Sequence, residues 1–357
     1  MNRYRSLILS AIALVVLVII VICATCQQDT PQQDPAVTTA PLPRQDKLIG
    51  ICLPAGSDAW TIAGNALRTQ LTDQGYRVEL VYGDGTAKTQ NTLLLELINK
   101  QVHCIVISAV DSAAMAEAES AALAKNIPIL SYGSLLMDTE AVKGYICYDY
   151  FEMGASIARY IETSLALASA EKENRSYTVE LFMGAPEDYH ATLLHKGIMS
   201  VLEPHLQNST LESKSHRTAF EDSCIIEWSE ATAEKACASR LKNSYAGTAP
   251  DVCICASDNI AAGVLRALEK NGTAPENMPL ITGNGAAEKG LQNLADGKQA
   301  LTVRTDPADP AVACCAMVDM VLFGIQPDFA VSEIFNNVTN VPTALCGFTL
   351  VYDKQGE

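Results

Sequence analysis

Residues 47–67 read KLIGICLPAGSDAWTIAGNAL and contain the unit from which the rest of the chain is built. Leu48–Leu53 is an almost continuous apolar run, which is typical of a parallel strand covered on both faces. A polar loop follows, in which Ser57 and Asp58 can cap the free N–H groups of the next helix. Trp60 then lies in the first helical turn, at the carboxyl end of the strand, where open α/β sheets bind ligands.

The same strand–loop–helix unit recurs along the chain, and this alternation predicts parallel sheets with helices on both faces. Further strands are expected at Arg77–Tyr82, His103–Ala109, Ile127–Tyr132, Tyr145–Tyr148, Tyr177–Met183, Asp251–Ala256, Leu280–Thr282 and Leu345–Val351. Helices are expected at Thr89–Lys100, Ser112–Ala124, Phe151–Ala168, Asp188–Leu202, Glu230–Leu241, Asn259–Glu269, Ala286–Leu294 and Asp309–Phe323.

Length and charge limit the function classes. The chain has 357 residues, of which 48% are hydrophobic, enough for two α/β lobes with full cores. Its formal net charge is −16, and it has no basic stripe that could neutralise phosphates. This composition argues against a nucleic-acid partner.

The first 26 residues predict attachment to a membrane. Arg3 and Arg5 precede the uncharged apolar run Leu7–Thr25. This is the pattern of an export signal, and the run is also close to the ~20 residues of a membrane-spanning helix. In one interpretation Cys26 is the lipidated first residue of a bacterial lipoprotein; in the other the segment remains as an anchor. Residues 27–46, rich in Gln, Pro and Thr, then form a disordered tether.

The chain has twelve cysteines, most of them inside apolar segments. Cys253 and Cys255 form a CxC pair on a predicted strand, without the second pair that a zinc site needs. We therefore interpret the following cysteines as small buried hydrophobic residues: Cys52, Cys104, Cys147, Cys253, Cys255, Cys314 and Cys315.

Nothing in the sequence predicts an enzyme or a cofactor. Gly283-Asn284-Gly285 follows a strand as a dinucleotide loop should, but Glu288 stands where the third glycine is needed. His190 and His195 are five residues apart, which does not place them on one helix face for a shared metal. No acid–base pair or activated nucleophile has a recognisable spacing.

Acidic residues recur just after predicted strands, at Asp111, Asp149 and Asp258. Each of them could be a helix N-cap, but together with Trp60 they favour a polyol or sugar site. Carboxylates accept hydrogen bonds from hydroxyl groups, and an aromatic ring stacks on the C–H face of a sugar. Other polar or aromatic residues at strand ends are Asp58, Ser134, Asp188, Tyr189, His190, Asn259, Asn284, Arg304 and Asp306.

From Lys47 to about Tyr352 the sequence resembles the type I periplasmic solute-binding proteins of sugar ABC transporters, in the branch that binds xylose and multiple sugars. The matching stretches are LPAGSDAW, YGDGTAKTQNTLLLELINKQVHCIVISAVD, ICYDYFEMG, ELFMGAPEDYHATLLHKGIMSVL, EWSEATAEKA, CASDNIAAGVL and ITGNGA.

The resemblance implies two Rossmann-like lobes joined by a three-strand hinge. It assigns an N-terminal lobe to residues 47–150, completed by about 300–330, and a C-terminal lobe to 151–299, completed by about 331–357. The ligand-binding residues that it implies are Trp60, Asp111, Asp149, Asp258 and Asn284, together with Tyr189, His190, Trp228 and Arg304.

The sequence departs from sugar-binding relatives at several of these loops. Gly133 and Ser134 stand where the relatives have Asp-Arg, and Tyr150 stands where they have Asn. Tyr189 and His190 replace a pair of Asn residues, and Gly285 replaces an Asp. The loss of charged hydrogen-bonding groups predicts a changed ligand, such as a larger glycoside, a deoxy-sugar or an aromatic-bearing solute.

These observations predict a membrane-tethered extracytoplasmic protein that delivers a small polar ligand to an ABC permease. The alternative is a sensory co-receptor of the same fold that presents its ligand to a membrane kinase or chemoreceptor. A sugar-responsive repressor would need a DNA-binding segment where the apolar N-terminal run stands.

Overall fold

The computed structural model describes residues 43–352, and the predicted export segment, Cys26 and most of the tether lie outside them. From Arg44 onward the chain forms one compact unit. Within residues 43–352 the strands form a seven-stranded sheet, a four-stranded sheet and a two-stranded pair. We call the seven-stranded sheet with its helices the first lobe, and the other strands with their helices the second lobe.

The first lobe contains the strand predicted from the opening stretch. Its sheet has the order β11-β12-β5-β4-β3-β1-β2. Its strands are β1 (Leu48–Leu53), β2 (Arg77–Tyr82), β3 (Cys104–Ile107), β4 (Ile129–Tyr132), β5 (Val142–Tyr148), β11 (Ser332–Phe335) and β12 (Asn340–Cys346). Its helices are η1 (Arg44–Asp46), α2 (Asp58–Asp73), α3 (Ala87–Asn99), η2 (Ser112–Met115), α4 (Ala116–Ala124) and α12 (Ala308–Phe323).

Strand β1 is buried on both faces, as its apolar run predicts. Ile49, Ile51 and Leu53 pack into one core cluster with residues of α2 and α12. Cys52 points the other way, into a second cluster with residues of α3 and α4. The alternation of successive side chains across a strand therefore places one helical layer on each face of this sheet.

The second lobe contains β7 (Leu211–Glu212), β6 (Tyr177–Phe182), β8 (Val252–Cys255) and β9 (Leu280–Ile281) in that order, with β10 (Leu301–Arg304) paired to β13 (Thr349–Tyr352). A bridge between Thr282 and Leu301 connects the two groups of strands. The helices are α5 (Tyr150–Ser164), α6 (Leu167–Lys172), α7 (Tyr189–Gln207), α8 (Phe220–Ser223), η3 (Ile226–Trp228), α9 (Glu230–Ser244), α10 (Asp258–Lys270), η4 (Pro275–Asn277) and α11 (Glu288–Ala295).

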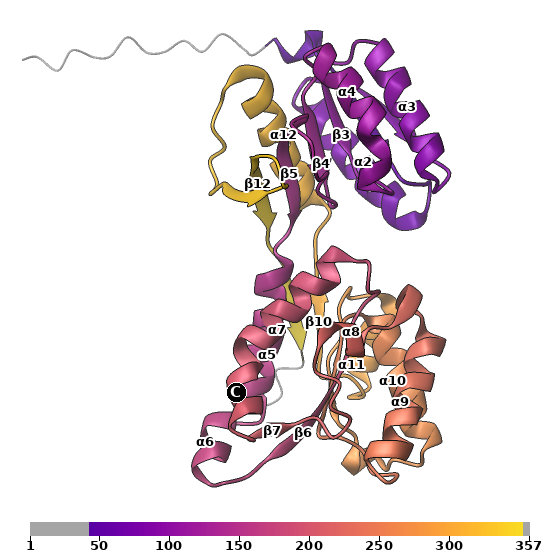
Figure 1. The fold of residues 1–357 in the computed structure, drawn as a ribbon, viewed down its shortest axis with the longest axis vertical. Helices are drawn as coiled ribbons and strands as arrows, with labels where there is room; N and C mark the ends of the chain where they lie inside the picture. The colour runs from indigo at the N-terminus through magenta and orange to yellow at the C-terminus, as the bar shows by residue number, and fades with distance from the viewer. Residues whose placement is uncertain (1–42, 353–357) are drawn as a thin grey trace, which may run out of the picture. The chain divides into compact units, whose positions relative to one another are not determined.

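Strand pairing corrects the predicted lobe boundaries near the end of the chain. Residues 301–304, part of the segment assigned to the first lobe, form β10, which pairs with β13 in the second lobe. The segment after residue 331, predicted in the second lobe, supplies β11 and β12 to the first sheet. In Figure 1, β5 and β12 lie side by side although they are far apart in the sequence. The weakly apolar run NVPTAL does not indicate a strand by itself, because burial against β5 is what selects it.

The chain passes between the lobes at three places, after β5, after β10 and after β12. These segments are hydrogen-bonded to one another. The Asp149 backbone N–H donates to the Cys346 carbonyl at 3.1 Å, and the Tyr148 hydroxyl donates to the Asp306 carbonyl at 3.1 Å. The structure thus has two α/β lobes joined by three crossing segments, as the sequence predicts.

Two other predictions concern the cysteines and the tether. The ten cysteines of the described residues are free thiols, and Cys224 is the one among them that is not buried. Burial raises the pKa of the Cys52 thiol to about 12. At the other end, Arg44–Asp46 was predicted to be the last part of the tether but forms a short helix on the first lobe. Among the described helices none is long and apolar enough to cross a bilayer.

Candidate functional site

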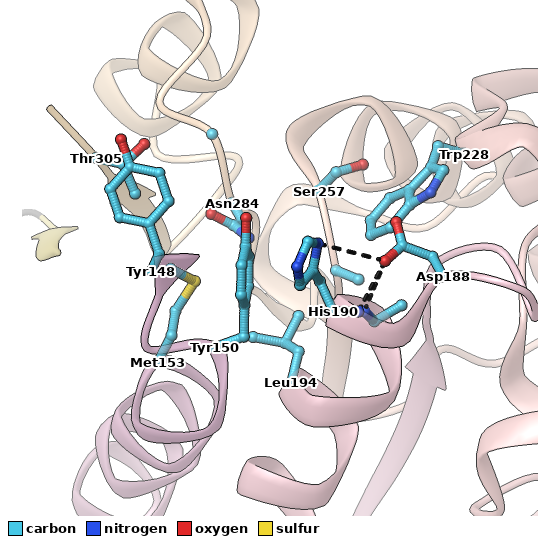
Figure 2. Close-up of a pocket in the computed structure, with 13 residues that line it drawn as sticks. Tyr148, Tyr150, Met153, Asp188, His190, Leu194, Trp228, Ser257, Asn284 and Thr305 are labelled. Atoms are coloured by element: carbon cyan, nitrogen blue, oxygen red, sulfur yellow. Dashed lines mark hydrogen bonds and ion pairs between the residues drawn. The ribbon is translucent and has the colours of Figure 1, made fainter. Parts of the chain in front are cut away.

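A pocket of about 260 Å³ lies at the carboxyl ends of strands of the second lobe. Figure 2 shows that its side chains come from separate loops and from the first turns of α5 and α7. Tyr148 is the last residue of β5, Ser257 follows β8, Asn284 follows β9, and Thr305 follows β10. The remaining labelled lining residues are Tyr150, Met153, Asp188, His190, Leu194 and Trp228.

Tyr150 and His190 form an aromatic wall of the pocket. Their rings are stacked with centroids 4.4 Å apart and an interplanar angle of 19° (Figure 2). His190 Nε2 lies 2.5 Å from the Gly133 carbonyl of the first lobe, and the Tyr145 hydroxyl donates to the same oxygen at 2.6 Å. Because a carbonyl oxygen can only accept, this contact assigns the proton of the imidazole to Nε2.

Asp188 connects this wall to the start of α7. Its carboxylate is the N-cap of the helix and accepts from the His190 backbone N–H at 2.8 Å. Asp188 Oδ1 also lies 3.6 Å from His190 Nδ1. Burial lowers the pKa of His190, and the nearby Asp188 carboxylate opposes this shift. The wall is therefore an aromatic surface with an uncharged imidazole at neutral pH.

Trp228 is a second aromatic residue of the lining. It ends the short helix η3, where both Glu227 and Trp228 have positive φ, of 58° and 52°. A Cβ atom at Gly184, just after β6, would lie 2.2 Å from the Trp228 ring. The indole therefore lies directly on the backbone of Gly184, and the absence of a side chain there makes its position possible.

The other polar groups of the pocket are neutral. Ser257 is the N-cap of α10 and accepts from the Ile260 N–H at 3.2 Å. Asn284 and Thr305 line the pocket from the loops after β9 and β10. No lysine or arginine lines it. Nor do three His, Cys, Asp or Glu side chains in residues 43–352 come together in a way that could hold a metal ion.

Residues 49–326 match the model of the periplasmic binding protein domain. The chain belongs to this family. This finding confirms the resemblance to type I periplasmic solute-binding proteins that the sequence showed.

Curated relatives and a solved structure are similar over most of the family domain. The chain is 28% identical over 293 residues to the multiple sugar-binding periplasmic protein SbpA of Azospirillum brasilense, covering 81% of each chain. It is 27% identical over 315 residues to the multiple sugar-binding periplasmic receptor ChvE of Rhizobium radiobacter, covering 87% of this chain and 88% of that one. A solute-binding protein of an ABC transporter from Clostridium phytofermentans, solved with bound β-D-glucose, is 28% identical with a TM-score of 0.75. That match covers 86% of this chain and 94% of the other.

Of the ligand residues that the sequence predicted, the structure brings His190, Trp228 and Asn284 together in the pocket. Tyr189, the neighbour of His190, is 50% exposed and does not line it. Arg304 is the exposed last residue of β10, next to the lining residue Thr305.

The other four predicted ligand residues lie outside the lining of the pocket. They are the acidic residues Asp111, Asp149 and Asp258 and the aromatic residue Trp60. Asp111 caps η2 through the Ala113 N–H at 3.0 Å, and Asp149 caps α5 through the Glu152 N–H at 2.9 Å. Trp60 is partly buried and packs against the core of the first lobe. Asp258 is only 2% exposed and bonds inside the second lobe. None of these four lines the pocket, so their ligand roles stay predictions.

Sequence reasoning did not select Tyr148, Tyr150, Ser257 or Thr305 as ligand residues, although each lines the pocket. Their positions in the sequence could have identified them. Tyr148 is the last residue of a strand, and the other three lie one or two residues after the end of a strand. They were not selected because the prediction gave priority to acidic residues after the strands.

Three of the departures from sugar-binding relatives contact one another in the structure. Tyr150 stacks on His190, and His190 hydrogen-bonds to Gly133. The departures are therefore one connected change in the walls of the site and not separate losses. An aromatic pair and a backbone carbonyl occupy positions where the resemblance to sugar-binding relatives predicts side chains of Asn and Asp-Arg.

Proposed function

We propose that this protein captures a small, uncharged, hydroxyl-rich solute in the pocket of Figure 2, a sugar or a glycoside. The observation that carries the proposal is the lining itself. The lining combines hydroxyl and amide groups of Tyr148, Ser257, Asn284 and Thr305 with the aromatic rings of Tyr150 and Trp228. Such groups donate to and accept from ligand hydroxyls, while aromatic faces cover the C–H side of a sugar ring. An anionic ligand would meet Asp188 and no cation in this lining.

The comparisons support a carbohydrate as the ligand class. Two relatives are named multiple sugar-binding proteins, and the similar structure from Clostridium phytofermentans holds β-D-glucose. The apolar side chains Met153 and Leu194 and the Tyr150–His190 wall make this pocket less polar than a site built for hydroxyls alone. This favours a ligand with an additional apolar part, such as a glycoside, a deoxy-sugar or an aromatic-bearing solute.

We further propose that the ligand promotes closure of the two lobes and is delivered to an ABC permease. The three crossing segments between the lobes are short, and ligand contacts to both lobes would favour the closed arrangement by differential affinity. In this proposal the protein works outside the cytoplasm, attached to the membrane through lipidated Cys26 or through an N-terminal helix. The function requires binding and release but no cofactor and no catalysis.

The proposal is tested by a thermal-shift screen of residues 43–357 against sugars, glycosides, polyols and nucleosides. A ligand at about one hundred times its Kd should stabilise the protein by ~2.7 kcal/mol, a shift of a few degrees. At the same ligand concentration the shift should be roughly halved in Asn284→Ala, as a tenfold loss of affinity predicts. It should persist in Tyr189→Ala, which changes an exposed neighbour of the pocket. The absence of a shift with every carbohydrate would contradict the proposal.

The alternative function is a ligand-presenting co-receptor for a membrane kinase or chemoreceptor. It is favoured by the relative in Rhizobium radiobacter, which is named a receptor. Neighbouring genes for a permease and an ATPase would support transport, and a neighbouring sensor kinase without them would support the co-receptor.

A further inference from the structure

Asp258 is a buried carboxylate that accepts hydrogen bonds from three residues distant in the sequence. It is the first residue of α10 and is 2% exposed. Its Oδ1 accepts from the Thr302 hydroxyl at 2.8 Å and from Gln299 Nε2 at 2.9 Å. Its Oδ2 accepts from the Ala287 backbone N–H at 3.0 Å. These bonds compensate the cost of burying the charge.

The surroundings of this carboxylate leave no space for another side chain. A Cβ atom at Gly283 would lie 2.3 Å from Asp258 Oδ1, and one at Gly290 would lie 2.2 Å from Oδ2. Two glycines on separate segments therefore allow the backbone to close around the carboxylate. A ligand in the pocket could not reach it without displacing this backbone.

The groups that Asp258 bonds hold the loop of residues 283–287. Its own backbone N–H donates to the Asn284 carbonyl at 2.9 Å, and Thr302 Oγ1 accepts from the Ala286 N–H at 3.1 Å. Ala286 has a φ of 45°, in the left-handed region that costs a residue with a Cβ atom free energy. This loop keeps its conformation because the surrounding hydrogen bonds determine it.

We propose that Asp258, with Thr302, is a positioning residue for ligand binding. It holds loop 283–287 so that Asn284 presents its amide to the ligand, and it does not contact the ligand itself. The inference rests on the proposed function of the pocket. It assigns to Asp258 a role different from the ligand contact that the family resemblance implied.

The first test measures the loop in the ligand-free protein, in residues 43–357, by amide hydrogen exchange. Thr302→Val removes the hydroxyl that donates to Asp258 and accepts from Ala286, at nearly constant volume. Asp258→Asn places an amide NH₂ opposite the Ala287 N–H. Both should increase exchange in 283–287 about tenfold or more.

Glu180→Gln is the matched control for these variants. Glu180 is another buried carboxylate of the second lobe, 1% exposed, and it bonds to Arg240, Tyr245 and Ser215. The variant should destabilise the lobe without a selective effect on loop 283–287. Equal acceleration in this control would overturn the inference, because the loop would then report only the general stability of the lobe.

The second test is a double-mutant cycle with the best carbohydrate of the thermal-shift screen. Asn284→Ala and Thr302→Val should each weaken binding about tenfold, and the double variant should bind no more weakly than Asn284→Ala. Fully additive losses would overturn the inference, because Thr302 and Asp258 would then act without Asn284. If no carbohydrate binds the unchanged protein, the proposed function fails. The exchange measurement then decides by itself whether Asp258 and Thr302 hold the loop.

Discussion

His190 takes part in more interactions than any other pocket residue described above, and its titration should be visible in the stability of the protein. Burial lowers the pKa of His190 in the folded state. The unfolded chain therefore binds more protons once the pH falls below the ordinary histidine pKa of about 6.5, and stability is lost as the pH falls. We expect Tm to decrease from pH 7 to pH 5.

The variant His190→Gln separates this residue from the other histidines. Glutamine can still donate to the Gly133 carbonyl but does not titrate in this range. The loss of Tm toward pH 5 should be smaller in the variant. It should not disappear, because burial also lowers the pKa of His103 and His195. An unchanged pH profile would contradict the assignment of a lowered pKa to His190.

Gly184 allows a direct test of the position of Trp228. In Gly184→Ala the new methyl group would overlap the indole ring, which would have to move away. We expect about tenfold weaker ligand binding, equivalent to ~1.4 kcal/mol, and a shifted tryptophan emission spectrum. Gly56→Ala is the control, since nothing lies within 4 Å of a Cβ atom at Gly56. Binding equal to that of the unchanged protein would mean that Trp228 is not a wall of the ligand site.

At the scale of elements, helices α5 and α7 pack closely enough for their backbones to touch (Figure 1). A Cβ atom at Gly197 would lie 1.9 Å from the Phe151 carbonyl oxygen, and one at Gly154 would lie 2.0 Å from the Leu194 carbonyl oxygen. Gly197→Ala should therefore cost at least about 1–3 kcal/mol of unfolding free energy, measured by urea denaturation. Lys196→Ala, on the exposed side of the same helix, should change it by less than ~0.5 kcal/mol.

The sequence predicted most elements because their apolar patterns are local. The strand Leu48–Leu53 and the helix at Asp309–Phe323 agree with the structure to within one residue. The pattern could not predict β12, whose side chains become buried only against β5, almost two hundred positions earlier in the chain, or the mostly exposed β11, which pairs with β12. It also could not predict that the Asp258 side chain is buried inside the second lobe, because its hydrogen-bond partners Gln299 and Thr302 are distant in the sequence.

For the whole molecule, the start of the compact unit is fixed by an ion pair. Arg44 donates from Nε and Nη2 to the Asp319 carboxylate of α12 at 2.9 and 2.6 Å. The Tyr76 hydroxyl donates to the same carboxylate at 2.5 Å. The nearby carboxylate raises the pKa of Arg44, and burial raises that of Tyr76. The end of the predicted tether is thus part of the first lobe.

Arg44→Ala should lower the free energy of unfolding by about 1.5–3 kcal/mol, because it removes both N–H donors of Arg44 from a mostly buried carboxylate. Urea denaturation of residues 43–357 measures this loss. Arg175→Ala is the control, since its ion pair with Glu173 is half exposed and should contribute less than ~1 kcal/mol. Equal effects of the two variants would mean that residue 44 is not part of the folded unit.

The insertion of the second lobe between β5 and β12 has a consequence for synthesis. The first sheet cannot be completed until the ribosome has made residues 340–346, and β10 lacks its partner until 349–352 follow. At ~20 residues per second, the delay after β5 is on the order of 10 s. During that time the β5 edge has no neighbour and can be held by a chaperone. A nascent chain that remains incomplete for so long is suited to transport across a membrane before it folds.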